Sequence, residues 1–273
     1  MQFSYKRRSK ISAIISGIVL SLPGSTVRAQ DAGGLPPSRT QGQQDSSPDH
    51  FIVGLGTAYS PAYEGSAKYR ALPLPAFDIK WGPFFANIGN GVGMDFIDTK
   101  YVTAGTGITF LPGYRAQDAP PRIGKLEVGA GGRVFVSLKA KGFIETIGAT
   151  RAIVGGAKGV VADLNLSRPI ALSPRLMLVP TIGTSWGDSE YNDRYFGVSV
   201  EQSVASGFPA FQPGSGFKDA SIALSANYCL TRHLSVGVSA GATMLLGDVK
   251  DSPIVFHRTQ PKGFLSMSYR FGS

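Results

Sequence analysis

The chain has 273 residues, of which 35 are glycine and 16% are charged, and its formal net charge is +9. Its single cysteine, Cys229, excludes an internal disulfide and a thiolate metal cluster. The basic residues are scattered along the sequence, which argues against a nucleic-acid-binding protein. After Ala29 no segment is long and apolar enough for a transmembrane helix, which needs about 20 residues.

The N-terminal region has the three parts of an export signal. A basic stretch, residues 6–10, precedes an apolar stretch, residues 11–22, and a Val-Arg-Ala sequence then ends at Ala29. We therefore expect residues 1–29 to be a signal peptide cleaved after Ala29, rather than a buried N-terminal helix. The peptide has five basic and no acidic residues, so its removal would lower the charge from +9 to about +4.

The next segment, residues 30–50, is rich in Gln, Ser, Pro, Gly and Asp, and Leu35 is its only large aliphatic residue. Such a segment cannot bury enough apolar surface to fold alone. We expect it to be a disordered leader in the periplasm, followed by a folded region over 51–271.

Alternation with a period of two is the main structural signal of that region. Leu234, Val236 and Val238 alternate with small or polar residues, as do the aliphatic residues of 218–229. Because neighbouring side chains of a strand point to opposite faces, each of these segments has one apolar face. The same pattern predicts twelve strands, at roughly 51–59, 70–80, 84–89, 91–97, 101–113, 125–138, 142–152, 158–168, 175–186, 218–229, 233–246 and 261–271.

The connections between these strands alternate between short and long. The short ones include 81–83, 98–100, 170–174 and 230–232, whereas the long ones include 114–124 and 187–217. Outer-membrane barrels have short periplasmic turns and long outer loops. The predicted fold class is therefore all-β, a transmembrane antiparallel up-and-down β-barrel.

Two connections fit this scheme less well. The turn 89–91 is short for an outer connection, and Tyr195–Val200 could form another strand. Ten or fourteen strands therefore stay open beside twelve.

Aromatic residues fall where two interfacial girdles would lie. We expect Trp81, Phe84, Tyr101, Tyr228, Tyr269 and Phe271 at the periplasmic ends of the strands and Tyr59, Tyr69, Tyr114 and Trp186 at the outer ends.

The last strand alternates and ends in Tyr269 and Phe271. This ending resembles the C-terminal signal that outer-membrane barrels present to the barrel-assembly machinery, which the resemblance implies as a partner. Gly272 and Ser273 follow here, whereas the usual pattern has the aromatic residue at the end.

Several motifs, in order, resemble those of one family, the MltA-interacting protein family, also called MipA/OmpV. The family's opening motif is similar to Tyr63, Glu64 and Gly65 with Leu72-Pro73-Leu74-Pro75. Its central and final motifs are similar to Trp186, Asp188, Tyr191, Tyr195, Phe196 and Gly197, then Ser206-Gly207-Phe208-Pro209, and Ser252 and Pro253.

This resemblance implies an outer-membrane protein, surrounded by outer-membrane lipid, without an enzymatic role of its own. It further implies a scaffold that joins a murein lytic transglycosylase to a murein synthase. Other members are described as porin-like channels or surface adhesins, so these activities stay open as alternatives. The resemblance makes the motif residues candidates for interactions and implies no cofactor.

The 187–217 segment is long for a connection, which indicates a function or disorder. Our hypothesis is that it folds back over or into the barrel mouth, and the alternative is a cap that merely seals the barrel.

A channel is the rival function. Four charged residues could line a narrow path through the lumen, or pair and close it: Lys125, Glu127, Arg133 and Asp163.

An enzyme is a weaker interpretation. A serine nucleophile needs a base within hydrogen-bond reach. Of the three histidines, only His257, near Ser252 and Asp251, falls in an outer loop. Acidic residues in 187–217 lack the spacing of a calcium-binding loop. We predict no catalytic, cofactor-binding or metal-binding residues.

Overall fold

The computed structural model describes residues 49–272. The predicted signal peptide, its cleavage site at Ala29 and the leader up to residue 48 lie outside the described residues. The first strand begins at His50, one residue before the expected start, and His50 Nε2 lies 3.3 Å from Asp78 Oδ1 on the neighbouring strand. His50 therefore belongs to the folded part of the chain and not to the leader.

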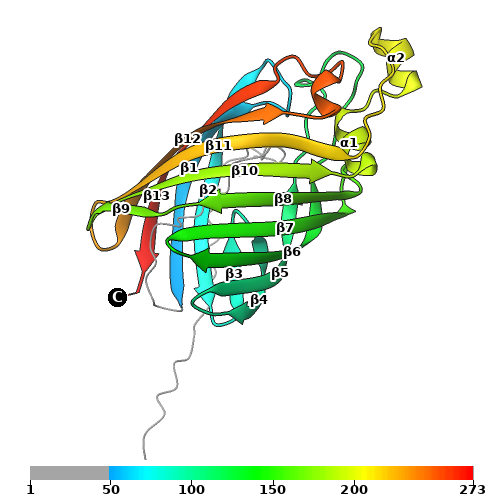
Figure 1. The fold of residues 1–273 in the computed structure, drawn as a ribbon. Helices are drawn as coiled ribbons and strands as arrows, with labels where there is room; N and C mark the ends of the chain where they lie inside the picture. Colours follow the sequence, from blue (N-terminus) through cyan, green and yellow to red (C-terminus); the bar gives the residue numbers. More distant parts are fainter. Residues whose placement is uncertain (1–48, 273) are drawn as a thin grey trace, which may run out of the picture.

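The described residues form one closed antiparallel sheet (Figure 1). Apart from β8 and β9, which both pair with β10, each strand pairs with the next along the chain, and pairing of the first strand with the last closes the ring. The strands are β1 (His50–Pro61), β2 (Tyr69–Trp81), β3 (Phe84–Asn87), β4 (Gly91–Asp98), β5 (Val102–Leu111), β6 (Gly129–Ala140), β7 (Phe143–Val154), β8 (Val160–Ser167), β9 (Ile170–Ser173), β10 (Leu176–Gly187), β11 (Gly216–Cys229), β12 (Leu234–Leu245) and β13 (Thr259–Phe271).

The prediction of twelve strands is confirmed, because β8 and β9 share one position in the barrel. Both pair with β10, β8 along its second half and β9 at its start. Arg168 and Pro169 interrupt the ladder between them, and proline has no N–H to donate. The predicted turn at 170–174 is wrong in its extent, since only Pro174 and Arg175 connect β9 to β10.

Side chains alternate between an outer and an inner face, as the sequence predicts. Leu224 and Val238, on the outer face, are each 50% exposed. Ser225 and Ser239 point inward from the same two strands, and their hydroxyls lie 3.1 Å apart. An apolar outer face around a polar interior is the pattern of a barrel in lipid. Among the described residues, no helix combines the length and apolar character needed to cross a membrane.

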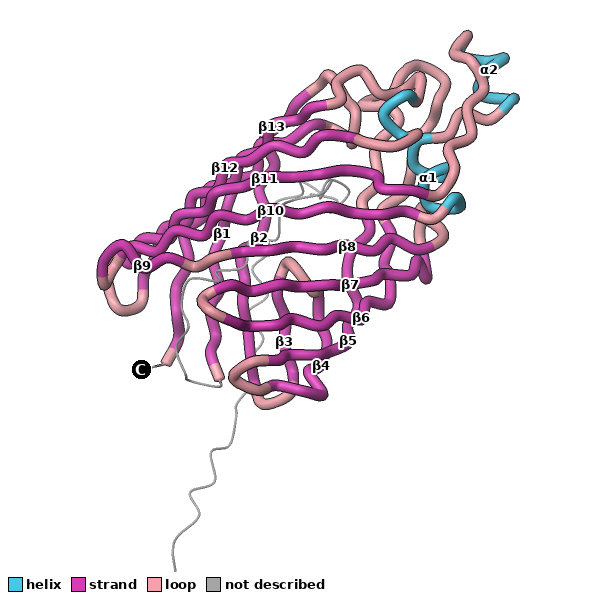
Figure 2. The backbone as a smooth tube through the Cα atoms, viewed as in Figure 1, coloured by secondary structure: helices cyan, strands magenta, loops and turns pink. Residues whose placement is uncertain are grey.

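Short and long connections collect at opposite ends of the barrel (Figure 2). We name the end with short connections, 82–83, 99–101, 141–142, 174–175 and 230–233, the turn end. The other, the loop end, carries 62–68, 112–128, 155–159, 188–215 and 246–258. The loop end also contains α1 (Ser189–Phe196), α2 (Val200–Ser206) and the 3-10 turn η1 (Val249–Asp251). The alternative of a strand over Tyr195–Val200 is wrong, because these residues end α1 and begin α2.

Two further predictions about this end are wrong. Tyr114 is buried among loop side chains instead of lying in an aromatic girdle. Lys125 and Glu127 lie in the 112–128 loop and form an exposed ion pair of 2.8 Å, because β6 begins only at Gly129. They do not line the lumen. At the turn end, the predicted girdle residues Trp81, Phe84, Tyr101, Tyr228, Tyr269 and Phe271 are all exposed.

Candidate functional site: a plug at the loop end

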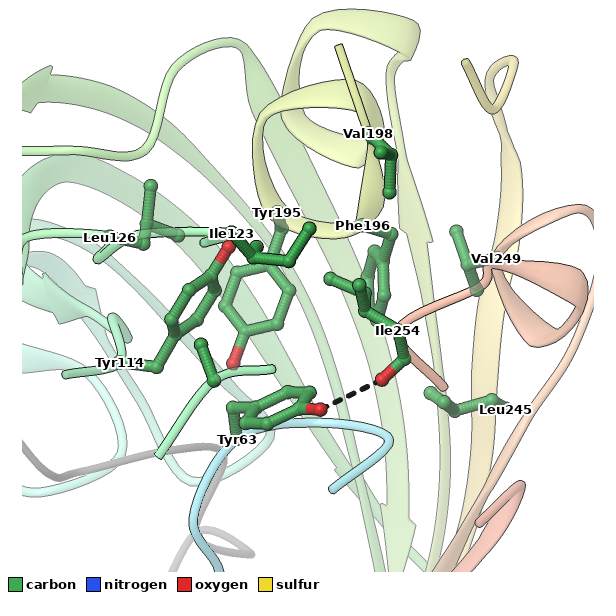
Figure 3. Packing of buried hydrophobic residues seen from close by; sticks show 11 residues of the cluster. Tyr63, Tyr114, Ile123, Leu126, Tyr195, Phe196, Val198, Leu245, Val249 and Ile254 are labelled. Carbon is green, nitrogen blue, oxygen red and sulfur yellow. Dashed lines mark hydrogen bonds between the residues drawn. The ribbon is translucent and has the colours of Figure 1, made fainter. Parts of the chain in front are cut away.

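The loop end is filled by a cluster of buried side chains, which we call the plug (Figure 3). Its members come from loops 62–68, 112–128, 188–215 and 246–258 and from the end of β12. Each of these loops contributes large side chains that burial removes from water, which stabilises the arrangement. The plug comprises Tyr63, Tyr114, Ala119, Ile123, Leu126, Tyr195, Phe196, Val198, Leu245, Val249 and Ile254.

Helix α1 brings the central aromatic residues of the plug into place. Its N-cap is Asp188, whose Oδ1 accepts a 2.7 Å hydrogen bond from the Tyr191 N–H. Asp188 Oδ2 accepts a 2.8 Å bond from the Val160 N–H at the start of β8. An N-cap side chain satisfies amide groups that the helix itself leaves unpaired. Asp188 therefore starts the helix and joins it to the barrel wall.

Gly159 makes this junction possible. It has a φ of 70°, and a Cβ atom there would lie 2.1 Å from Asp188 Oδ1 and 2.7 Å from the Tyr191 nitrogen. Any other residue would be strained at this φ and would also collide with the cap. The loop 155–159 and the start of α1 thus need a glycine at this position.

Tyrosine hydroxyls link the loops of the plug. The Tyr63 hydroxyl donates a 2.8 Å bond to the Ile254 carbonyl, and the Tyr195 hydroxyl accepts a 3.3 Å bond from the Glu64 N–H. Burial raises the pKa of Tyr114 to about 12 and raises the pKa of Tyr63, Tyr191 and Tyr195 as well. These side chains are therefore neutral hydrogen-bonding groups at ordinary pH.

Further bonds join the first loop to β13 and the last loop to α1. Gln260 donates to the Ser66 carbonyl at 3.1 Å and accepts from the Gly65 N–H at 2.9 Å. The Ser252 hydroxyl donates a 2.6 Å bond to the carbonyl of Phe196 at the end of α1. Loops 62–68, 188–215 and 246–258 are thus held by buried polar contacts as well as by packing, as buried polar groups require.

An ionic cluster lies directly below the plug. Lys218 Nζ is 2.6 Å from Glu64 Oε2 and 2.6 Å from Asp219 Oδ2, and all three side chains are at least 88% buried. Ser185 donates a 2.6 Å bond to the same Asp219 oxygen, and Lys262 is buried beside the group. We call Glu64, Lys218, Asp219 and Lys262 the ionic cluster. Its charges balance, as burial in a low-dielectric interior demands.

Below the ionic cluster the lumen holds a cavity of about 520 Å³. On its opposite wall, Arg133 binds Asp163 through two nitrogens, at 2.6 and 2.9 Å. Arg133 also donates to Asn90 at 3.1 Å and to Thr150 at 3.2 Å. Of the two options that the sequence left open for Arg133 and Asp163, the structure thus shows pairing.

The structure brings together nearly all of the predicted motif residues. Tyr63, Glu64, Gly65, Asp188, Tyr191, Tyr195, Phe196, Gly197, Ser252 and Pro253 lie in or against the plug and the ionic cluster. Trp186 instead lies at the end of β10, paired with Phe217. Tyr269 and Phe271 lie together at the turn end, with ring centroids 4.9 Å apart. That the motif residues bind a partner, and that the last two guide assembly, stay predictions.

The sequence did not lead us to predict four residues of this site, Lys218, Asp219, Gln260 and Lys262. Lys218 could not have been found, because β11 has an extra residue opposite Ser185 and Trp186 that turns it inward. Simple alternation would place it on the lipid face with Ile222. Gln260 and Lys262 share a face with the inward Phe264, so alternation in the last strand could have placed them in the lumen.

The described residues contain few groups suited to metal binding or to nucleophilic catalysis. They contain no group of three or more His, Cys, Asp or Glu side chains that could hold a metal ion. His257 is exposed at the rim of the loop end, while the Ser252 hydroxyl is committed to Phe196. The arrangement can close the mouth and hold loops in place.

A model of the MltA-interacting protein MipA family matches residues 53–271. The 24 kDa outer membrane protein of Pasteurella multocida is 27% identical over 117 residues, which cover 42% of this chain and 45% of that protein. The MltA-interacting protein of Escherichia coli is 35% identical over 80 residues, which cover 29% of this chain and 32% of that protein. The matched segments thus span less than half of each of these relatives.

Two solved structures are similar at the level of the backbone. The KdgM porin has a TM-score of 0.45 at 6% identity, covering 81% of this chain and 99% of that one. The NanC porin has a TM-score of 0.43 at 10% identity, covering 80% of this chain and 98% of that one. At these scores neither structure indicates what the chain does.

Proposed function

The chain belongs to the MltA-interacting protein MipA family, and we propose that it is a non-enzymatic scaffold that joins a murein lytic transglycosylase to a murein synthase. It is an outer-membrane β-barrel protein, as its family and relatives are. The lytic transglycosylase as partner rests on the name of the Escherichia coli relative.

The plug is the observation that carries this proposal. Tyr63, Tyr195 and Phe196 are at most 2% exposed, so the mouth is packed like a protein interior. A barrel whose mouth is filled by its own loops is better suited to hold partners than to pass solutes. The side chains of the ionic cluster occupy the lumen below the plug. They bind one another, so they offer few free charges to a passing solute.

The turn end is where periplasmic partners would bind. The exposed basic residues Lys100, Lys141, Arg168, Arg175 and Arg232 ring this end, beside the exposed aromatic residues Trp81 and Tyr101. Aromatic and arginine side chains are enriched at binding surfaces, and a basic ring attracts an acidic partner. We therefore propose that the partner presents an acidic surface to this ring.

Crosslinking in intact envelopes tests the proposal. A photo-crosslinking amino acid at residue 101 or 141 should capture a murein lytic transglycosylase, and the double variant Lys141→Glu, Arg175→Glu should reduce the yield. The matched control is Lys125→Glu, Lys158→Glu at the loop end, where both lysines are exposed. Capture of no murein enzyme, or equal loss in the two variants, would leave the scaffold without support.

A narrow channel is the second candidate, and the polar lumen favours it. Besides the cavity, Lys80 pairs with Asp95 and with Asp98 near the turn end, so charged groups follow the interior along its length. A channel would require the plug to move aside. Conductance measurements therefore separate the two candidates.

A further inference from the structure

The barrel wall is incomplete between β2 and β5. The two strands that should fill this space, β3 and β4, form a short hairpin, since β3 has four residues and the turn falls at 88–90. β2 pairs with β3 only over Asp78–Trp81, whereas it pairs with β1 over Tyr69–Lys80. The remaining nine residues of β2, Tyr69–Phe77, thus have a strand on one side only.

The other side of the gap is the upper part of β5. Its pairing with β4 ends at Ile108, opposite Val92, and Thr109–Leu111 pair with β6 alone. Figure 2 shows the β3–β4 hairpin ending part of the way along the wall. Nine residues of strand extend roughly 30 Å. The free edge of β5, Thr109–Leu111, extends roughly 10 Å, so the opening is bounded by a long edge and a short one.

Among the described residues, the 112–128 loop closes the upper end of this opening. Arg70 Nη1 binds Asp118 Oδ2 at 2.7 Å, and Arg115 Nε binds the same oxygen at 2.7 Å. These ion pairs fix the 112–128 loop above the opening. The hairpin turn forms its lower edge, and β2 and β5 form its two sides.

The edge of β2 is adapted to remain without a neighbour. It contains Pro73 and Pro75, which lack an N–H, and residues two apart direct their backbone groups to the same side of a strand. The Ala62 N–H donates to the Lys68 carbonyl at 2.9 Å, so in this register the hydrogen-bonded pairs of β1 with β2 fall on even positions. Pro73 and Pro75 lie between them, and the two missing donors therefore belong to the open side. Proline is tolerated at such edges, and each donor removed is one fewer to satisfy in lipid.

The opening leads from the lipid-facing surface into the cavity. Phe110 and Val92, at its outer rim, are 69% and 61% exposed, and Leu74 and Ile88 line the passage. Farther in, the same cavity is lined by Asn90, Thr150 and the ionic groups already described. An apolar entrance with a polar interior fits a molecule with an apolar chain and a polar head.

The head group of that molecule should carry no charge. Arg133 already binds both oxygens of Asp163, and Lys218 already binds Glu64 and Asp219. Lys262, which also lines the cavity, is the second cation that balances these two carboxylates. A buried ionic head group would have no free counter-charge among these groups, which is costly. A hydroxyl or amide head could instead hydrogen-bond to neutral side chains such as Thr109 and Asn165, which line the cavity.

We propose that the gap between β2 and β5 is a lateral entrance through which an uncharged amphiphile of the outer membrane reaches a binding site in the lumen. The site is separate from the plug and from the turn end. The proposal is therefore independent of the scaffold function.

The first test asks whether lipid chains reach the passage. In a variant with Trp81→Phe and Trp186→Phe, a single tryptophan is introduced by Leu74→Trp and its fluorescence is measured in vesicles of phospholipid brominated on the acyl chains. Val238→Trp is the lipid-facing control and Asn227→Trp the lumen-facing control. Quenching of Leu74→Trp to the extent of Val238→Trp is expected. Quenching as weak as that of Asn227→Trp would mean that the wall is closed.

The second test measures binding with the neutral probe N-phenyl-1-naphthylamine and the full chain in lipid nanodiscs, with empty nanodiscs subtracted. 1-Dodecanol should displace the probe at least about tenfold more effectively than dodecanoate or dodecylammonium, because burying an unpaired charge costs free energy. Leu74→Trp should weaken displacement, and Val238→Trp should not. Equal displacement by the three compounds, or no effect of Leu74→Trp, would overturn the proposal.

Discussion

The hydroxyl of Tyr63 and the carbonyl of Ile254 are joined by a 2.8 Å hydrogen bond, although 191 residues separate them along the chain. The bond connects the first loop of the loop end to the last one. Between them lies Tyr195 of α1, whose ring centroid is 5.7 Å from that of Tyr114. The plug therefore unites distant parts of the chain, so damage to one loop should loosen the others.

We expect alkaline pH to release the plug. Burial raises the pKa of Tyr63 and Tyr195 above the ordinary 10.0 and that of Tyr114 to about 12. A group whose pKa is higher in the folded state contributes stability that is complete below its unfolded pKa and is lost as the pH rises through the folded value. Cleavage of the 188–215 loop by protease should therefore increase above about pH 10. Unchanged cleavage at pH 12 would contradict this.

Removing the charge of Lys218 should destabilise the barrel strongly. The variant Lys218→Met leaves Glu64 and Asp219 buried side by side, and breaking a buried pair typically costs about 3–5 kcal/mol. The exposed pair of Arg258 with Asp251 is the control, where Arg258→Met should cost about 0–1 kcal/mol. Urea unfolding in phospholipid vesicles measures both. Equal effects in the two variants would mean that the ionic cluster contributes no more than a surface pair.

Alanine substitutions at two glycines distinguish the cost of a strained φ from the cost of a steric collision. Gly159 and Gly142 have φ values of 70° and 81°, but a Cβ at Gly142 would meet nothing within 4 Å. Gly142→Ala should cost about 1 kcal/mol from strain alone. Gly159→Ala should cost more and should also expose α1 to protease, because the new methyl group displaces Asp188 from its cap. If both variants behave alike, the junction between α1 and the wall is less close than the structure indicates.

Arginine substitutions on the two faces of β11 test the contact with lipid. Leu224→Arg should cost about 2–4 kcal/mol near the bilayer midplane. Ser221→Arg, three positions away, points into the cavity and should be far milder. Unfolding in vesicles gives both values, and a cost for Ser221→Arg that matches the cost for Leu224→Arg would show that the faces are assigned wrongly.

The strands could be predicted because the barrel environment imposes a simple rule on them. In β12, for example, Val236 and Val238 must contact lipid while Ser235 and Gly237 face the lumen, so alternation is nearly complete. β9 could not be separated from a turn, because Arg168 and Pro169 break the pattern after only a short strand. Its existence depends on pairing with β10, which is a tertiary contact.

The loop end was less predictable, since its helices have eight and seven residues and little periodicity. One local signal was present: Ser199 and Gln202 form the capping box of α2, with a 3.2 Å bond from the Gln202 N–H to the Ser199 hydroxyl. The prolines at 73 and 75 were likewise a sign of an edge strand. Which loops meet at the mouth depends on the closed ring and could not be deduced from one segment at a time.

The closed mouth is the central claim, and single-channel recording in planar bilayers tests it most directly. We predict no steady conductance for the wild-type protein, and steady conductance once residues 189–213 are replaced by a short Gly-Ser linker. Steady conductance of the wild-type protein, unchanged by that replacement, would show that the plug does not close the barrel.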